Sequence, residues 1–369
     1  MSRPNHQKIL LQFNETFNRT KSKIRSELSS IARTGPNIWL AFDEGSGLHR
    51  LTRDNDGYGQ HIRFALKDYI YLPAGDEEEV DIEGLAYADH YLWVVGSHSL
   101  KRDKPDDMDD PVSKRIKCLS KIKNDPNRYT IARVPVIQNK ESGDFELFKS
   151  HPHPENPVVM LTAAKLKAKE NYSELSEELR YDRHLCKFME IPGKDNGFDI
   201  EGIAVLGERV FIGLRGPVLR GYALILEIAL DEKKNGKLKL KKIGKDGAKY
   251  RKHFVHLQGM GIRELAFADQ DLLILAGPTM DCDGAISLYR MNNGPADVEE
   301  SLTYNDELDQ LFHVSLGHET PYGKDKAEGI TLTEDHNIMV VYDAPSEERV
   351  VGETDAYADI FEYDKAADY

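Results

Sequence analysis

A six-residue motif recurs along this chain of 369 residues and constrains its fold more than any other feature. Its clearest copy is Asp199-Ile200-Glu201-Gly202-Ile203-Ala204, and residues 81–86 nearly duplicate it. Residues 327–331 follow the same form, and residues 262–266 carry Arg263 where the other copies have glutamate. Each copy is followed by a turn and an apolar run. A strand–turn–strand unit repeated at intervals of tens of residues predicts a repeat architecture.

A degenerate copy at residues 29–32 precedes these four. Aligned on the small residue of the motif, successive copies lie 54, 118, 62 and 65 residues apart. Units of four antiparallel strands at this spacing are the blades of a β-propeller. The doubled interval holds either a sixth unit or an insertion, and residues 150–192 show no pattern of four strands. We therefore predict one all-β domain over residues 1–369, a β-propeller with five blades; six blades is the alternative.

Two segments interrupt the repeat. Residues 101–127 are densely charged with both signs, which predicts an exposed loop insertion with room for a short helix. Residues 160–190 are rich in Ala, Leu, Lys and Glu, and this composition favours a helical insertion. At the N-terminus, the β-prone residues 8–13 are expected to complete the last blade and close the ring.

Charge and cysteine content narrow the classes of function. A net charge of -14 argues against a nucleic-acid partner, because such binding comes mainly from Lys and Arg on phosphates. The three cysteines, Cys118, Cys186 and Cys282, lie far apart, so we expect neither a disulfide framework nor a zinc site. The N-terminus lacks the apolar core of a signal peptide, and no apolar run approaches the roughly 20 residues of a membrane span. We expect a cytoplasmic protein with no membrane partner.

Propeller geometry gathers the polar residues of the motifs at one place. The innermost strand of a blade lines the central channel and the second strand returns antiparallel to it, so inner-strand starts and second-strand ends share one face. Inner-strand starts supply Asp81, Glu83, Asp199, Glu201, Arg263, Lys326 and Glu328. Second-strand ends and the loops beyond them supply Asp43, Glu44, Ser97, His98, Arg215, Arg220, Asp281 and Asp343.

These residue types suit two kinds of ligand. Carboxylates from several blades fit a hard divalent cation, calcium, magnesium or manganese, and the predicted metal ligands are Glu83, Glu201, Glu328 and Asp343. Arginine favours an anion, and the predicted ligand contacts are Arg215, Arg220, Arg263, Lys326 and Ser97. Both together indicate an anion bridged by a metal. Glu201 or His98 beside it would act as the catalytic acid–base group.

Each of these proposed functional residues also has a purely structural explanation. The glutamates of the motif could serve only to accept backbone or Arg263 hydrogen bonds and lock the blades together. Glycines at the next motif position allow close approach of neighbouring backbone. Ser97-His98-Ser99 is either a catalytic cluster or a capped turn. Asp281-Cys282-Asp283-Gly284 resembles part of a calcium loop and also a hairpin turn.

Several motifs occurring together resemble the bacterial family catalogued as domain of unknown function 3616 (DUF3616). They are residues 81–86 with 96–101, residues 199–204 with 214–221, residues 275–281, and residues 328–343. The resemblance runs from about Ser29 to Tyr363 and implies a relative of the β-propeller superfamily, with no established activity to transfer. More distantly, the motif looks like that of phytase-like and lactonase-like propellers, several of which are metal-dependent hydrolases. At the level of fold this analogy has little weight.

Two functional hypotheses follow. The first is a propeller that binds an anionic small molecule at its channel mouth and hydrolyses a phosphoester, ester or lactone. The second is a non-catalytic ligand sensor or a protein-interaction scaffold, with a protein partner on the inserted segments.

Overall fold

Strands dominate the computed structural model, which describes residues 6–14, 24–42, 45–75, 78–105, 108–280, 282–314 and 324–363. The described residues contain two short α-helices, α1 (Val112–Cys118) and α2 (Glu174–Leu179). None of the described helices has the length and apolar character needed to cross a membrane. The all-β class predicted from the sequence is confirmed.

The larger sheets each contain a motif strand and the strands that follow it. One sheet joins both ends of the chain, in the order β2 (Leu28–Thr34), β3 (Asn37–Phe42), β4 (Gly47–Arg53), β5 (Gly57–Ala65), β1 (His6–Leu11), β31 (Asp355–Phe361), β29 (Ile338–Asp343) and β28 (Lys326–Leu332), with β30 (Val350–Val351) on β31. The next has the order β6 (Ile82–Ala88), β7 (Tyr91–Gly96), β10 (Ile131–Gln138), β14 (Ala164–Leu166), β21 (Lys237–Leu240) and β20 (Leu230–Lys233), with β11 (Phe145–Leu147) on β10.

The remaining large sheets come from the second half of the chain. One has the order β17 (Asp199–Leu206), β18 (Arg209–Gly216), β19 (Tyr222–Ile228), β22 (Arg251–His256) and β26 (Glu300–Thr303). The other has the order β23 (Gly261–Ala268), β24 (Asp271–Gly277), β25 (Ile286–Met291) and β27 (Asp309–Val314).

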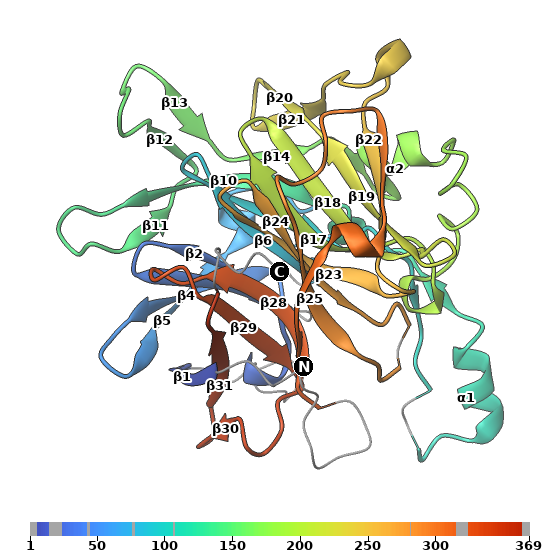
Figure 1. The fold of residues 1–369 in the computed structure, drawn as a ribbon, viewed down its shortest axis with the longest axis horizontal. Coiled ribbons are helices and arrows are strands. Elements are labelled where there is room, and N and C mark those ends of the chain that lie inside the picture. Colours follow the sequence, from blue (N-terminus) through green and yellow to red (C-terminus); the bar gives the residue numbers. More distant parts are fainter. Residues whose placement is uncertain are drawn as a thin grey trace.

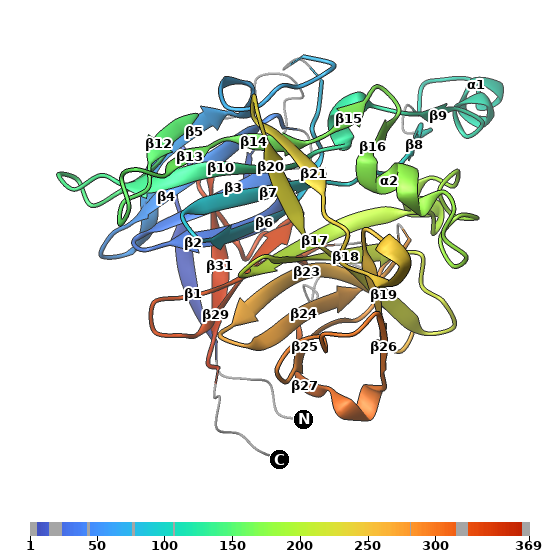
Figure 2. The same cartoon turned by 90° about the horizontal axis from the view of Figure 1, so that it is seen from above.

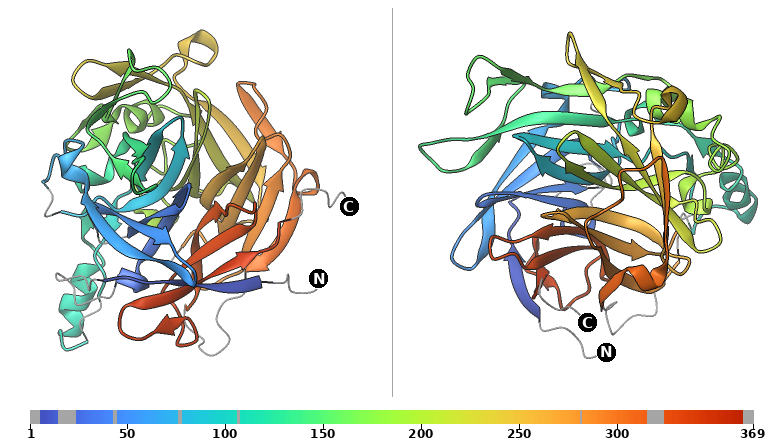
Figure 3. Two further views of the ribbon diagram at one scale, coloured as in Figure 1. Left: turned by 90° about the vertical axis from the view of Figure 1, so that its left-hand side faces the viewer. Right: turned by 45° about the horizontal axis from the view of Figure 1, so that its top comes forward.

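The motif strands meet at the centre of the molecule. β2 packs against β6, β6 against β17, β17 against β23, β23 against β28, and β28 against β2. Figure 3 (left) shows the sheets following one another around this common centre. A cyclic order of sheets, each with its motif strand innermost, is a propeller-like architecture.

The apolar core lies between neighbouring sheets. Side chains of successive strand residues point to opposite faces, so both faces of a sheet can be buried. On β7, Val94 packs in a cluster with Trp39 of the preceding sheet, whereas Trp93 packs in a cluster with Ile203 of the following sheet. Similar clusters fill the spaces between the other adjacent sheets, and one more lies between the β2–β5 half and the β28–β31 half of the sheet that joins the chain ends. Burial on both faces explains why the second strands are continuous apolar runs.

The N-terminal strand β1 closes the ring. It pairs antiparallel with β31 over residues His6 to Leu11, and Leu10 and Leu11 also pair in parallel with β5. Figures 1 and 2 show β1, in blue, beside β31, in red. The strand predicted at residues 8–13 therefore joins the last motif unit as expected, and it also bridges to the first.

The helical insertion predicted at residues 160–190 is wrong for most of its length. The segment forms β13 (Met160–Thr162), β14, β15 (Ala168–Lys169) and β16 (Tyr172–Ser173) before the six residues of α2; β13 pairs with β12 (Ser150–Pro152). β14 fits between β10 and β21, with Ala164 and Leu166 in the core. Pairing on both sides and burial of all three β14 residues outweigh the modest helix propensity of Ala, Leu and Lys.

The charged segment 101–127 forms an exposed excursion. β8 (Lys101–Arg102) pairs with β9 (Ile122–Lys123), and α1 lies between them with no buried residue. Figures 1 and 2 show α1 standing away from the sheets. The expected exposed segment with one short helix is therefore present.

The contribution of β1 to closing the ring of sheets can be tested by substitution. Leu11 is 1% exposed and pairs with strands on both sides, so Leu11→Ala is expected to lower the free energy of unfolding by about 2–5 kcal/mol. Urea unfolding measures this loss. Gln7→Ala, at an exposed position of the same strand, is the control and should change stability by less than about 0.5 kcal/mol. Equal effects of the two substitutions would contradict a closing role for β1.

Candidate functional site at the channel mouth

Each motif strand contains a β-bulge at the glutamate position. Pairing with the second strand skips Glu83, Glu201, Arg263 and Glu328, and it skips Ser29 in the degenerate copy. A bulge leaves one residue outside the ladder and re-aims its side chain. The repeated motif thus places one bulged, polar residue at the start of every inner strand.

Arg215 is skipped on the partner strand of Glu201. Its neighbours Gly216 and Leu214 pair with Asp199 and Ile200, which leaves Arg215 outside the ladder. Its Nη1 donates to Glu201 Oε1 at 2.5 Å and its Nη2 donates to the Met280 carbonyl at 3.3 Å. The two side chains are 7% and 5% exposed, so the bulges create a buried ion pair.

Arg263 extends this pair to two further sheets. Its Nη1 contacts Glu328 Oε2 and lies 3.7 Å from Glu201 Oε2. The Arg263 side chain is 5% exposed and that of Glu328 is 14% exposed. The result is a chain of alternating charges, Arg215, Glu201, Arg263 and Glu328, across three neighbouring sheets.

A second polar group lies at the start of β6. Arg128, from the loop before β10, has its Nη2 3.1 Å from Asp81 Oδ2, and its Nη1 donates to Ser99 Oγ at 3.2 Å. The Ser99 hydroxyl in turn donates to Ser97 Oγ at 3.1 Å. Ser97 is therefore already held within the protein. Nothing in the sequence around Arg128 indicated this position.

His98 is a buried neutral base. It is 3% exposed, and burial lowers its pKa to about 4. Its Nδ1 lies 2.9 Å from the Gly96 carbonyl, which can only accept, so Nδ1 carries the proton. Its Nε2 is buried and has no hydrogen-bond partner among the described residues. The ring stands edge-on to Tyr129, with 5.5 Å between the ring centroids.

Two carboxyl groups at the mouth bind protons near neutral pH. Burial raises the pKa of Asp199 to about 7; Glu201 adds to the rise and Arg215 opposes it. Burial also raises the pKa of Glu328 to about 7, opposed by Arg263 and assisted by Glu201. The pKa of Asp343 is raised by burial and opposed by Lys326. Clustered carboxyls with shifted pKa values are typical of functional sites, and also of structural ion-pair networks.

The other predicted site residues are distributed less tightly. Lys326 and Asp343 are partners in the register of β28 and β29 at the same end of the inner strands. Glu83 is half-buried in its bulge. Arg220 is exposed on the turn before β19, with no ion pair to any described residue. Asp43, Glu44 and Asp281 lie outside the described residues.

The carboxylates of the mouth face arginines. Glu201 accepts from Arg215, and Glu328 contacts Arg263. In the described part of the chain, no three His, Cys, Asp or Glu side chains lie close enough together to hold a metal ion. The divalent cation predicted from the sequence stays a prediction.

Glu264, at the glycine position of its motif copy, ties inner strands together. It is fully buried, its Oε2 contacts the Ser30 hydroxyl, and its Oε1 accepts from the backbone N–H of Leu265 at 3.0 Å and of Ile203 at 3.3 Å. Ser30 Oγ accepts from the Leu85 N–H at 2.8 Å. One carboxyl group thus connects β2, β6, β17 and β23. Burial raises its pKa well above the ordinary value.

Glycine at the same position of other copies leaves space for neighbouring backbone. A Cβ on Gly84 would lie 3.0 Å from the Ile203 nitrogen, and one on Gly202 would lie 3.0 Å from the Leu265 nitrogen. The sequence therefore did contain a signal for Glu264, because a glutamate at a position reserved for glycine requires partners at the centre.

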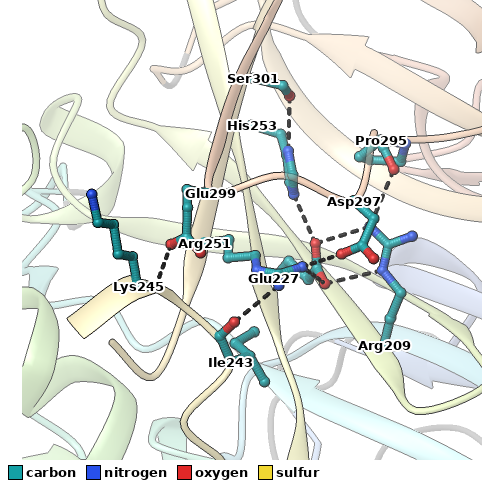
Figure 4. A network of polar contacts seen from close by, with 10 residues as sticks. All are labelled: Arg209, Glu227, Ile243, Lys245, Arg251, His253, Pro295, Asp297, Glu299 and Ser301. Atoms are coloured by element: carbon teal, nitrogen blue, oxygen red, sulfur yellow. Dashed lines mark hydrogen bonds and ion pairs between the residues drawn. The ribbon is translucent and has the colours of Figure 1, made fainter. Parts of the chain in front are cut away.

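A larger polar network lies away from the channel, between β18, β19, β22 and β26 (Figure 4). Glu227 accepts from Arg209 at 3.0 and 2.9 Å and from Arg251 at 3.3 Å, and lies 3.0 Å from His253 Nε2. His253 Nδ1 lies 2.8 Å from Ser301 Oγ. Burial raises the pKa of Glu227, but hydrogen bonds from His253 and Arg209 outweigh it and hold the value at about 2. Its oxygens are engaged, so we interpret this network as structural.

Comparison with known proteins places the chain in a family. The sequence profile of the family described as protein of unknown function (DUF3616) matches residues 27–359. The chain belongs to this family. The match includes the five bulged motif strands and therefore the channel mouth, whereas β1, which closes the ring, lies before the matched residues. Among curated proteins, none matches the sequence.

Solved structures similar to this DUF3616 protein have varied functions. Streptogramin B lyase is 10% identical with a TM-score of 0.34, covering 96% of this chain and 97% of that chain. Glutaminyl cyclase from Myxococcus xanthus is 7% identical with a TM-score of 0.39, covering 93% and 94%. The PQQ-bound form of aldose sugar dehydrogenase from Streptomyces coelicolor is 8% identical with a TM-score of 0.37, covering 97% and 99%.

The contacts of Glu264 predict a graded loss of stability. Glu264→Ala leaves the Ser30 hydroxyl and two backbone N–H groups buried without an acceptor, at about 1–3 kcal/mol each, whereas Glu264→Gln keeps an acceptor oxygen. Urea unfolding should therefore show a loss of several kcal/mol for Ala and a clearly smaller loss for Gln. Equal losses would show that Glu264 contributes volume rather than hydrogen bonds.

The raised pKa of Asp199 predicts a pH dependence of stability. The folded state holds this proton up to about pH 7, whereas an ordinary Asp loses it near pH 3.8. The folded state therefore binds more protons between these values, and the contribution of Asp199 to stability falls as pH rises through this window. Asp199→Asn should remove this fall, so the variant gains stability relative to the native protein between pH 5 and pH 8.

Urea unfolding at the two pH values measures this gain. The expected gain in unfolding free energy is about 1.4 kcal/mol for each pKa unit by which folding raises the pKa of Asp199 within the measured pH range. Asp56→Asn, an exposed carboxyl, is the control and should show no such gain. A pH-independent difference for Asp199→Asn would contradict a proton held at Asp199.

Proposed function

We propose that this DUF3616 protein is a five-bladed β-propeller that binds an anionic small molecule at its channel mouth and hydrolyses an ester, phosphoester or lactone bond. Five motif strands in cyclic contact support the blade count, as do five apolar clusters, four between sheets and one between the two halves of the sheet that joins the chain ends. The β-bulge that recurs in the motif strands is the observation that supports ligand binding at the channel mouth. It directs polar side chains from neighbouring blades to one end of the channel.

Arginine supplies the attraction for an anion. The planar guanidinium groups of Arg215 and Arg263 match carboxylate or phosphate oxygens. The Nε atoms of both are buried without a hydrogen-bond partner among the described residues. An incoming anion would take the place of Glu328 on Arg263, and protonation of Glu328 favours this exchange because it weakens the internal ion pair. Arg220 and Lys326 are proposed as outer contacts.

Carboxyl groups supply the acid–base chemistry. In the proposed reaction, water adds to the electrophilic carbon or phosphorus and gives a proton to the Glu201 carboxylate. Glu328, with a pKa of about 7, gives its proton to the leaving oxygen. His98 is the second candidate base, through its unpartnered Nε2. A divalent cation bound by Glu83, Glu201, Glu328 and Asp343 is proposed as an alternative to this proton relay, because a carboxylate that ligates a cation does not hold a proton; bound there, the cation would supply Lewis-acid polarisation of the scissile bond.

The alternative is a non-catalytic sensor or scaffold. In that case the chain of ion pairs from Arg215 to Glu328 only joins three blades. The inserted helix α1 offers a surface for a protein partner, since Val112 and Ile116, four residues apart, are 68% and 63% exposed.

Hydrolysis of a panel of esters, phosphoesters and lactones separates the two functions. Native protein is expected to turn over one class, and Glu328→Gln to reduce kcat by about 10²–10⁴-fold because the proton donor is lost. Glu141→Gln, an exposed glutamate, is the control and should leave turnover unchanged. Circular dichroism confirms that each variant folds, and metal analysis of purified protein tests for the cation. No turnover of any class, or full turnover by folded Glu328→Gln, would overturn the enzymatic function.

A further inference from the structure

A lysine ladder lies on the outer edge of the sheet that begins with β6, far along the sequence from the motif strands. Lys165 on β14, Lys167 in the connection after it and Lys169 on β15 alternate with apolar residues, and Lys237 and Lys239 alternate with Leu238 and Leu240 on β21. β14 and β21 pair in parallel with Lys165 opposite Lys237 and Leu166 opposite Leu238. Residues in register on adjacent strands share a face, so Lys165 and Lys237 lie on the same face of the sheet.

This arrangement repeats at the edge. On the next strand, β20, Lys233 pairs directly opposite Lys237, whereas Asp231 pairs directly opposite Lys239. Adjacent strands lie about 4.8 Å apart, and like charges directly opposite one another are destabilising. The row Lys165, Lys237 and Lys233 therefore places three like charges side by side in a chain of net charge -14.

The ladder borders a cavity. A hollow of about 360 Å³ is lined by six lysines and two glutamates, together with Tyr172 and two apolar residues. The lining lysines are Lys167, Lys169, Lys233, Lys237, Lys239 and Lys249. A pocket of this size is large enough for a small-molecule ligand.

Of the carboxylates nearby, Glu174, Glu178 and Asp231 contact lysines, and Glu177 also lines the pocket. Lys249 contacts Glu174 and Glu178, each at 2.8 Å, and Lys233 lies 3.3 Å from Asp231. Among the described residues, Lys167, Lys237 and Lys239 have no ion pair. Next to them, Lys165 is 8% exposed and its Nζ has no hydrogen-bond partner in the described part of the chain. The pocket lining thus carries an excess of positive charge, six lysines against two glutamates.

We propose that this pocket binds a molecule that carries a chain of phosphate groups. Lysine ammonium groups bind phosphate as point charges, and alternate residues on a strand are spaced about 6.7 Å apart, so successive lysines can each meet a different phosphate. This site is separate from the channel mouth and does not depend on the function proposed there. Inorganic polyphosphate and nucleoside triphosphates both carry such a chain of phosphates, so either class would fit the proposed pocket.

Calorimetric titration of the full chain with tripolyphosphate tests the proposal. Native protein is expected to bind it, with an affinity that falls as salt is raised. The triple variant Lys167→Gln, Lys237→Gln, Lys239→Gln is expected to bind about tenfold more weakly or worse, because three uncompensated charges are removed. The charge-matched control substitutes the exposed lysines Lys117, Lys140 and Lys187 by Gln and should bind like native protein.

A second titration uses adenosine triphosphate without metal. Equal affinity for the two probes would support recognition of the phosphate chain alone. Three outcomes would overturn the proposal: no binding of either probe by native protein, an equal loss in the charge-matched control, or loss of binding in Arg215→Gln with full binding in the lysine variant. The last outcome would place the phosphates at the channel mouth.

Discussion

Five strand backbones approach one another closely at the centre of this protein, and that crowding governs the chemistry around it. Gly84, Gly202 and Gly329 leave room for the backbone of the next strand. At the equivalent position Glu264 fills this space with its carboxyl group, which accepts hydrogen bonds from backbone N–H groups of two strands and from the hydroxyl of Ser30. One buried acceptor thereby connects four inner strands, which a purely apolar centre could not do with the same directionality.

The residue before each glycine position is displaced into a bulge. Glu201, Arg263 and Glu328 therefore meet at the channel mouth, where neighbouring charges must alternate because burying an unpaired charge is costly. Burial raises the pKa of Asp199 and of Glu328 to about 7, and the nearby Glu201 adds to both rises. The same crowding that builds the ring thus produces groups suited to proton transfer near neutral pH.

The sequence predicted the motif strands, closure by β1 and the exposed excursion around α1, because each depends on a local pattern. It failed at residues 160–190, where Ala, Leu, Lys and Glu favour a helix and the segment instead forms strands. β14 is held by pairing with β10 and β21, and β21 is supplied from beyond residue 236. The local sequence pattern does not reveal such a distant pairing partner, so helix propensity alone predicted a helix where strands form.

By itself, the repeated motif determined the ring of sheets, the glycine contacts and the grouping of Glu201, Arg263 and Glu328, since period and position in a repeat fix which residues are equivalent. Only the tertiary structure decided which charges pair. Arg128 reaches Asp81 from a loop, and His98 is sealed in a neutral state, because distance and burial come from the packing of sheets rather than from residue order.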